Sequence, residues 1–229
     1  MSKDVNRRAF MNAAGIAAAT GLVVPSALAA DEAVKPADKV LIIGVACSPR
    51  KGKTTATAVQ TALDAAKAVN SSIETHLIDL GGMVFSGMNA SGEFGEDDFQ
   101  RFVLPKLREP KPAGLIIGSP VYFRNFSSTC MAFLERLAVL RKPSLLLAGI
   151  PMGVLTVGAY RNGGQELVIS QIQAAMLCHE AVIVGGKPGA HQGATLWNNY
   201  NDDITKDEFG IDTAKKLGIR VAEAALKLA

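Results

Sequence analysis

The sequence predicts an α/β fold in which one open parallel sheet carries helices on both faces. Five apolar, β-rich runs alternate with five runs of helical period, which is the pattern of repeated strand–helix–strand units. The first run, VLIIGVA at residues 40–46, is apolar throughout, as expected for a strand buried on both faces of such a sheet. Once a leader is set aside, about 200 residues remain, which suits a single domain.

The elements follow from the apolar period of each segment. We expect strands at residues 40–46, 73–80, from 114 onward, 143–151 and 181–185, and helices at 55–69, 97–107, 127–140, 167–178 and 205–228. Residues 83–95 are rich in Gly and Ser and predict a long loop. The sequence TKDE at 205–208 predicts a capping box that opens the last helix. A second loop, 187–205, holds Trp197 and Tyr200, which either cover a ligand or pack on the domain or a neighbouring subunit.

The first 38 residues are expected to lie outside this domain. Residues 6–11, NRRAFM, resemble a twin-arginine export motif, and a modestly apolar run at 13–24 precedes a small-residue site at 27–29. We expect residues 1–29 to be a signal peptide, 30–38 a short linker and 39–229 the domain. The apolar run is too short to span a bilayer, which weakens the alternative of a membrane anchor. Export of the folded protein to the periplasm is therefore the expectation.

Charge and cysteine content exclude several classes of function. The formal net charge is only +3, so neither nucleic acid nor an anionic membrane surface is implied as a partner. The three cysteines, Cys47, Cys130 and Cys178, are too scattered for a disulfide framework or for metal-ligand spacing. We expect them to be small core residues, and we expect no metal site.

The junction after the first strand carries the clearest chemical signal. Residues 47–55, CSPRKGKTT, combine hydroxyls, cations and a glycine between a strand end and a helix start. The first turn of a helix has backbone N–H groups without internal partners, and the helix dipole adds positive charge there, so the junction favours a phosphate. The candidate phosphate-binding residues are Ser48, Arg50, Gly52, Lys53, Thr54 and Thr55. An ordinary solvated loop is the alternative.

Two phosphate-loop patterns compete at this junction. The nucleotide triphosphatase pattern G-x-x-x-x-G-K-[ST] is nearly met, but Cys47 replaces its first glycine and Pro49 removes an N–H group. The other pattern, a strand followed by S-P-R-K-G-x-[NST]-T and a helix, resembles the phosphate loop of flavodoxin-like FMN proteins. It is most similar to the NADPH-dependent FMN reductase and iron–sulfur flavoprotein group.

Two later loops carry the same resemblance. The strand from Gly114 ends in GSPVYF before a helix containing AFLER, similar to the second flavin-contacting segment of the family, although Arg124 stands where the family usually has Gly. The GGQE that opens a later helix resembles the family's third loop. The residues implied to contact the cofactor are Pro120, Val121, Tyr122, Phe123, Arg124 and Asn125 in the second loop and Gly158, Ala159, Tyr160, Gly163 and Gly164 in the third. Burial of Tyr122 and Phe123 in the core, and a simple Gly-Gly turn, are the alternatives.

The resemblance implies a flavodoxin-like sheet of order 2-1-3-4-5 whose three loops meet at one switch point, with FMN as the cofactor. It implies an FMN-dependent oxidoreductase that takes electrons from NAD(P)H or a redox partner and gives them to a small acceptor such as a quinone, flavin or metal species. It also implies a homodimer or higher homo-oligomer. No side chain is expected to act as an acid or base, and residues 83–95 lack the cysteines that an iron–sulfur cluster needs. An electron carrier, or a nucleotide-binding protein without flavin, stays open.

Overall fold

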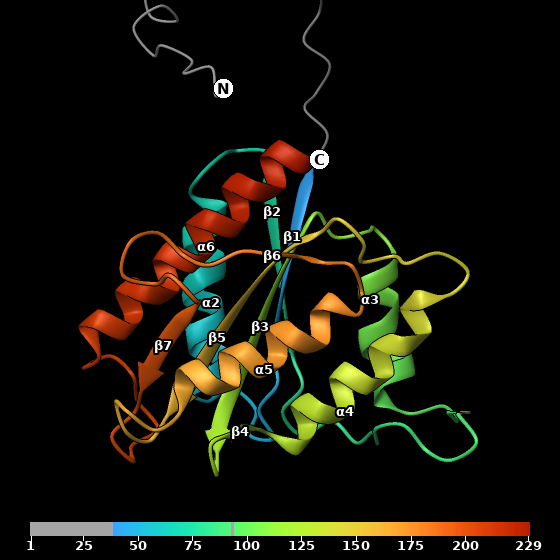
Figure 1. The fold of residues 1–229 in the computed structure, drawn as a ribbon, viewed down its shortest axis with the longest axis horizontal. Helices are drawn as coiled ribbons and strands as arrows, with labels where there is room; N and C mark the ends of the chain where they lie inside the picture. The colour runs from blue at the N-terminus through green and yellow to red at the C-terminus, as the bar shows by residue number, and fades with distance from the viewer. Residues whose placement is uncertain (1–38, 93) are drawn as a thin grey trace, which may run out of the picture. The chain divides into compact units, whose positions relative to one another are not determined.

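The computed structural model describes residues 39–92 and 94–229, so the expected signal peptide and linker lie outside the described residues. Its centre is a sheet of parallel strands in the order β2-β1-β3-β5-β6, shown in Figure 1. The strands are β1 (Val40–Ala46), β2 (Ile73–Asp79), β3 (Gly114–Tyr122), β5 (Pro151–Gly158), β6 (Val182–Ile183) and β7 (Ala194–Trp197), with β4 (Asn125–Phe126) folding back on β3. Leaving out β4, this is the 2-1-3-4-5 order, and the predicted fold class is confirmed.

Helices cover both faces of the sheet. They are α2 (Thr54–Lys67), α3 (Leu104–Arg108), α4 (Ser128–Arg136), α5 (Gln165–Leu177) and α6 (Glu208–Leu228). A π-helical turn, Phe99–Val103, leads into α3, and a 3-10 turn, Leu137–Arg141, continues α4. In the described part of the chain no helix is long and apolar enough to cross a bilayer.

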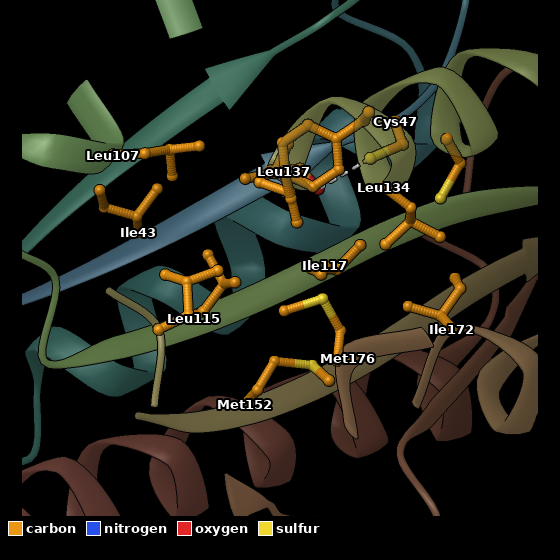
Figure 2. Close-up of a cluster of buried hydrophobic side chains, with 14 of the residues drawn as sticks. Ile43, Cys47, Leu107, Leu115, Ile117, Leu134, Leu137, Met152, Ile172 and Met176 are labelled. Atoms are coloured by element: carbon orange, nitrogen blue, oxygen red, sulfur yellow. Dashed lines mark hydrogen bonds between the residues drawn. The ribbon is translucent and has the colours of Figure 1, made fainter. Parts of the chain in front are cut away.

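The side chains of β1 point alternately into two separate apolar cores. Ile42 and Ala46 face α2 and α6, whereas Ile43 and Val45 face α3, α4 and α5. Figure 2 shows part of the second core, where Ile43 and Leu107 lie on one side and Met152 and Met176 on the other. Because both faces are buried, the uninterrupted apolar run in the sequence is what this strand requires.

The fourth parallel strand was predicted in the wrong place. The sequence favoured residues 143–151, but the strand is Pro151–Gly158, and the triple leucine before it forms a turn. Hydrogen bonds from Ala148 N–H to the Leu145 carbonyl and from Ile150 N–H to the Leu147 carbonyl close that turn. Leu147 and Ile150 still point into the core, so their hydrophobicity reflects burial and not extended backbone. Gly153 of β5 leaves room for α6, since a Cβ there would come within 2.8 Å of Leu217.

Two details near the C-terminus also differ from the expectation. The loop predicted over 187–205 contains β7, which pairs with the carboxyl half of β5, while β6 pairs with its amino half. The predicted capping box does not form, because the Thr205 hydroxyl bonds Asp203 at 2.7 Å and Asp207 is the N-cap of α6. The two short strands together make one edge of the sheet.

Candidate functional site

Three loops leave the carboxyl edge of the sheet from the neighbouring strands β1, β3 and β5 (Figure 1). The structure ties them to one another directly. The Ser127 hydroxyl, just after the second loop, donates to the Cys47 carbonyl of the first at 2.5 Å. A Cβ at Gly164 in the third loop would lie 3.3 Å from the Cα of Arg124 in the second. The three loops named from the sequence therefore lie together, at the position where such sheets bind ligands.

The first loop presents the start of α2 without a cap. Lys53 is the N-cap residue, and no side chain accepts a hydrogen bond from the first turn. Thr54 and Thr55 follow, both almost fully buried. Two hydrogen bonds hold the backbone of this loop. Ser48 Oγ accepts from the Arg50 N–H at 3.2 Å, and Asp79 Oδ2, at the end of β2, accepts from the Gly52 N–H at 2.7 Å. A helix start that is rigidly held and uncapped is suited to an anion.

The second loop is a tight β3–β4 hairpin whose turn residues are Phe123 and Arg124. Their φ angles are 51° and 63°, so two residues with side chains occupy the left-handed region in which glycine is usual. Tyr122 is 40% exposed and Phe123 is fully exposed, which contradicts the alternative that both fill the core. Pro120, at the end of β3, is buried, whereas Val121 is half-buried and Asn125 is exposed. The hairpin therefore offers aromatic surface at the edge of the sheet.

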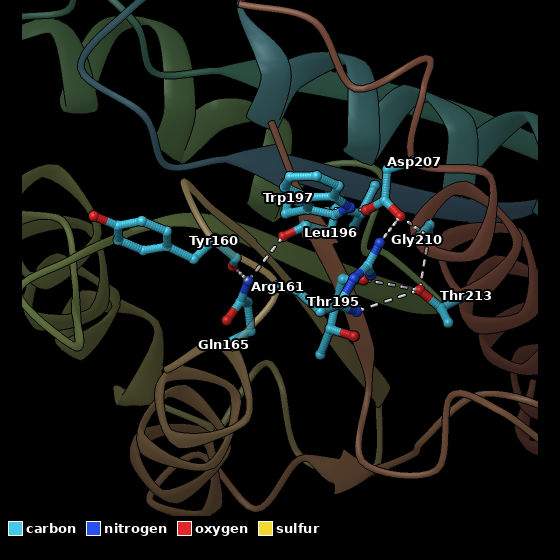
Figure 3. Close-up of polar contacts among 9 residues, drawn as sticks. All are labelled: Tyr160, Arg161, Gln165, Thr195, Leu196, Trp197, Asp207, Gly210 and Thr213. Atoms are coloured by element: carbon cyan, nitrogen blue, oxygen red, sulfur yellow. Dashed lines mark hydrogen bonds and ion pairs between the residues drawn. The ribbon is translucent and has the colours of Figure 1, made fainter. Parts of the chain in front are cut away.

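The third loop runs from Gly158 to the start of α5. The buried amide of Gln165 donates to the Tyr160 carbonyl and, at 3.2 Å, to the Leu196 carbonyl (Figure 3). A Cβ at Gly158 would come within 2.5 Å of that amide. Gly164 has a φ of 107° and precedes α5 without a side-chain cap. The glycines at 158 and 164 are thus required by Gln165 and Arg124, while Ala159 and Gly163 are half-buried between them.

A fourth segment, residues 198–203, was not assigned to the site from the sequence. Asp202 forms ion pairs with Arg50 at 2.5 Å and with Lys53 at 3.2 Å, the two cations of the first loop. Hydrogen bonds from Lys53 and then Arg50 lower the pKa of Asp202. Tyr200 packs edge-on against Tyr160, with ring centroids 5.0 Å apart. We call residues 198–203 the strap, because they connect the first loop to the third.

Asp207, just after the strap, contacts Trp197, just before it (Figure 3). Its buried carboxylate accepts from the Trp197 N–H at 2.8 Å, from the Gly210 N–H at 2.9 Å and from the Arg161 guanidinium. The guanidinium also lies 5.4 Å from the Trp197 ring centroid. Trp197 therefore packs on the domain beside Arg161 of the third loop, and Tyr200 packs on Tyr160 of the same loop, so both aromatic residues left open by the sequence contact that loop.

The loop predicted over 83–95 is organised by polar contacts from α4. Arg136 is buried; it donates to the Asp97 carboxylate, and to the Ser86 carbonyl at 3.1 Å. Its guanidinium lies 3.9 Å from the Phe94 ring centroid, and the neighbouring Glu135 accepts from the Met88 N–H at 2.7 Å. Burial alone would raise the pKa of Asp97, but hydrogen bonds from Arg136 and the Gln100 N–H lower it.

The cysteines follow the prediction only in part. Cys47 and Cys130 are buried, and burial followed by the neighbouring Cys130 thiol raises the pKa of Cys47 well above its usual value. Cys178 is exposed, which contradicts its predicted place in the core. Among residues 39–92 and 94–229, no three His, Cys, Asp or Glu side chains gather in a way that could hold a metal ion.

The residues at this edge fit a phosphorylated cofactor with a flat ring. An uncapped helix start, two buried hydroxyls and two cations match a phosphate monoester, and exposed Tyr122 and Tyr160 offer surfaces for an aromatic ring. The fold and the site thus define a flavodoxin-like cofactor-binding protein.

Comparison with known proteins gives the family. Residues 39–195 match the model of the NADPH-dependent FMN reductase family, and the chain belongs to that family. An iron–sulfur flavoprotein of Methanocaldococcus jannaschii is 36% identical over 190 residues, which cover 80% of this chain and 95% of the relative. Family membership makes FMN the cofactor, and the protein is a flavin-dependent oxidoreductase.

Solved structures agree on the fold. A WrbA-like flavodoxin from Agrobacterium tumefaciens superposes with a TM-score of 0.56 at 14% identity, covering 84% of this chain and 100% of that one. RosB, solved with bound 8-demethyl-8-formylriboflavin-5'-phosphate, superposes with a TM-score of 0.63 at 15% identity, covering 84% of this chain and 80% of that one.

Proposed function

We propose that this protein passes electrons from a reduced donor through bound FMN to a small acceptor such as a quinone, a flavin or a metal species. The observation that carries the proposal is the uncapped start of α2, with buried Thr54 and Thr55 beside the cations Arg50 and Lys53. FMN supplies one- or two-electron redox chemistry when bound. The residues of the three loops bind it, orient it and set its surroundings.

The first loop would hold the phosphate. The N–H groups of the first turn of α2 would donate to phosphate oxygens, together with the hydroxyls of Ser48, Thr54 and Thr55. Arg50 and Lys53 would add charge, and Gly52, whose φ is 66°, lets the loop turn into the helix. Because the domain is nearly neutral, the charges of Arg50 and Lys53 would provide the main electrostatic attraction for the phosphate.

The second and third loops would hold the ring. The hairpin segment of Pro120, Val121, Tyr122, Phe123, Arg124 and Asn125 would lie on one side, and Gly158, Ala159, Tyr160, Gly163 and Gly164 on the other. Backbone N–H groups of the third loop would stabilise negative charge on the pyrimidine edge of the ring. We assign no side chain as a general acid or base.

The donor follows from location, which we infer from the leader. A twin-arginine leader would carry the folded protein to the periplasm, where NAD(P)H is not the expected donor. A redox protein or quinol-linked partner then becomes the better candidate. Accumulation in the periplasmic fraction, abolished by Arg7→Lys with Arg8→Lys, would support export; retention of wild type in the cytoplasm would overturn it.

An exported electron carrier is the second candidate function. Exposed Tyr122, Phe123, Tyr160 and Tyr200 make the edge of the site accessible to a partner, which favours exchange with another protein. Small-molecule turnover distinguishes the two, because an oxidoreductase consumes the acceptor catalytically and a carrier exchanges electrons only with its partner.

The experiment that tests the cofactor assignment is the absorption spectrum of the purified full chain, followed by heat release and identification of the chromophore. We expect FMN in near-stoichiometric amount. A colourless preparation that binds ATP and takes up no flavin would instead support a nucleotide-binding protein. Anaerobic addition of NADPH then separates donors: a bleached flavin band indicates NADPH, and an unchanged band indicates a partner protein.

We also propose a homodimer or higher homo-oligomer. The fully exposed Phe123 at the tip of the hairpin supports this, since a large apolar side chain so placed gains from a covering surface. Light scattering of wild type and Phe123→Ser should show a shift to smaller mass in the variant; a monomeric wild type would contradict the proposal.

A further inference from the structure

The ion pairs of Asp202 connect the strap to the two cations of the first loop. Asp202 Oδ1 contacts Arg50 at 2.5 Å and Oδ2 contacts Lys53 at 3.2 Å, so each carboxylate oxygen takes one cation. A phosphate bound at the start of α2 would draw on the same guanidinium and ammonium groups. The carboxylate and a dianionic phosphate cannot share them without repulsion.

We propose that Asp202 is an internal competitor for the phosphate-binding cations, and that the strap must release Arg50 and Lys53 when a phosphate monoester binds. This inference rests on the proposed function for the identity of the ligand. Asp202 then lowers the affinity for ligands that carry a phosphate and leaves the affinity for ligands without one unchanged, because only a phosphate competes with its carboxylate.

The strap contacts the site loops through the Asp202 ion pairs, the Tyr160–Tyr200 ring contact and the Asn198 N–H, which donates to the Gly158 carbonyl at 3.0 Å. Asn199 and Tyr200 have φ angles of 48° and 59°, an unfavourable region for residues with side chains. A cavity of about 390 Å³ adjoins the segment and is lined in part by Asn198, Asn199, Asn201 and Asp203 of the strap. The ion pairs themselves are about half exposed, and such pairs are individually weak.

The geometry distinguishes the side-chain cations from the backbone of the helix start. Asp202 takes Arg50 and Lys53 but caps none of the first-turn N–H groups of α2. Removing its charge should therefore free the two cations and leave the helix start as it was. The effect should appear in the association rate of a phosphate ligand, because the competitor acts before binding.

The test uses the full-length apoprotein and Asp202→Asn, with Asp203→Asn as the matched control. Asp203 is the adjacent carboxylate, and its hydrogen bonds run to Thr205. We expect Asp202→Asn to bind FMN roughly three- to tenfold more tightly through faster association, on the scale of weak exposed ion pairs. Riboflavin, which lacks the phosphate, should bind all three proteins equally.

A second measurement uses inorganic phosphate as the ligand and needs no flavin. It should raise the melting temperature of Asp202→Asn more than that of wild type or Asp203→Asn. Unchanged or weaker binding of FMN and phosphate by Asp202→Asn would overturn the inference, as would an equal gain for riboflavin. If wild type bound no FMN, the proposed function would fail, while the phosphate measurement would still decide the role of Asp202.

Discussion

Helices α2 and α4 begin at the same edge of the sheet, yet a side chain caps the first turn of α4 and none caps that of α2. At α4, Ser127 accepts from the Cys130 N–H at 3.0 Å and donates to the Cys47 carbonyl, so the chain caps its own helix. At α2, no side chain accepts from the first turn, although hydroxyls stand beside it. The π-helical turn and α6 follow the first pattern, through Asp97 and Asp207.

The difference separates groups that stabilise the fold from groups available to a ligand. A capped first turn has its N–H groups satisfied and contributes to stability. An uncapped one keeps that hydrogen-bonding capacity for an anion. Substitutions at the capped starts should lower the free energy of unfolding, and substitutions at α2 should lower ligand affinity.

The largest effect is expected at the uncapped start of α2. Replacing Thr54 and Thr55 by Val should weaken FMN binding by about 2 to 4 kcal/mol, from the loss of two charge-assisted hydrogen bonds. The free energy of unfolding of the apoprotein should change little. Fluorescence titration measures the affinity, and Thr57→Val, an exposed hydroxyl that bonds the Lys53 carbonyl of its own helix, is the control. Unchanged retention in the double variant would place the phosphate elsewhere.

At the capped start of α6 we expect the substitution to lower the free energy of unfolding, and not the ligand affinity. Asp207→Ala removes an N-cap, the acceptor of the Trp197 N–H and the partner of Arg161. We expect a loss of about 2 to 3 kcal/mol in the free energy of unfolding, measured by urea denaturation of the apoprotein. Asp203→Ala, an exposed neighbour, should be nearly neutral. Equal midpoints for the two variants would contradict the assigned role.

Ser127→Ala tests the capped start of α4, as the Thr54 and Thr55 double variant tests the uncapped start of α2. It removes the cap of α4 and leaves the buried Cys47 carbonyl without its donor. We expect destabilisation of about 2 kcal/mol in urea, with Ser128→Ala as the exposed control. Should FMN affinity fall and stability stay constant, the distinction between the two helix starts would be wrong.

The smallest expected effect is a pH dependence of stability at Asp97, which accepts from the Gln100 N–H at the π-helical turn. Because the folded pKa of Asp97 lies below its usual 3.8, its charged form contributes stability that is present above the unfolded pKa. That contribution is lost as pH falls through the folded value. Urea midpoints measured from pH 6 down to about pH 3 should therefore fall less steeply in Asp97→Asn than in wild type. Parallel curves would show that Asp97 does not titrate with folding.

How much the sequence could predict depended on how local each signal is. The β1–α2 junction was recognisable because strand, phosphate loop and helix follow one another within residues 40–55. Asp202 was missed because its partner Arg50 lies 152 positions away and no spacing links them. The fourth parallel strand was misplaced because three leucines resemble a strand more than the glycine-containing Pro151–Gly158 does, although α6, which packs on that strand, requires the glycine at 153.

The guanidinium of Arg136 lies 3.9 Å from the Phe94 ring centroid and 4.7 Å from that of Phe99. It also donates to the Asp97 carboxylate and to the Ser86 carbonyl, so it joins α4 to two points of the segment that precedes the π-helical turn. One buried side chain therefore couples the position of this segment to that of α4, and a displacement of the helix would carry the segment with it.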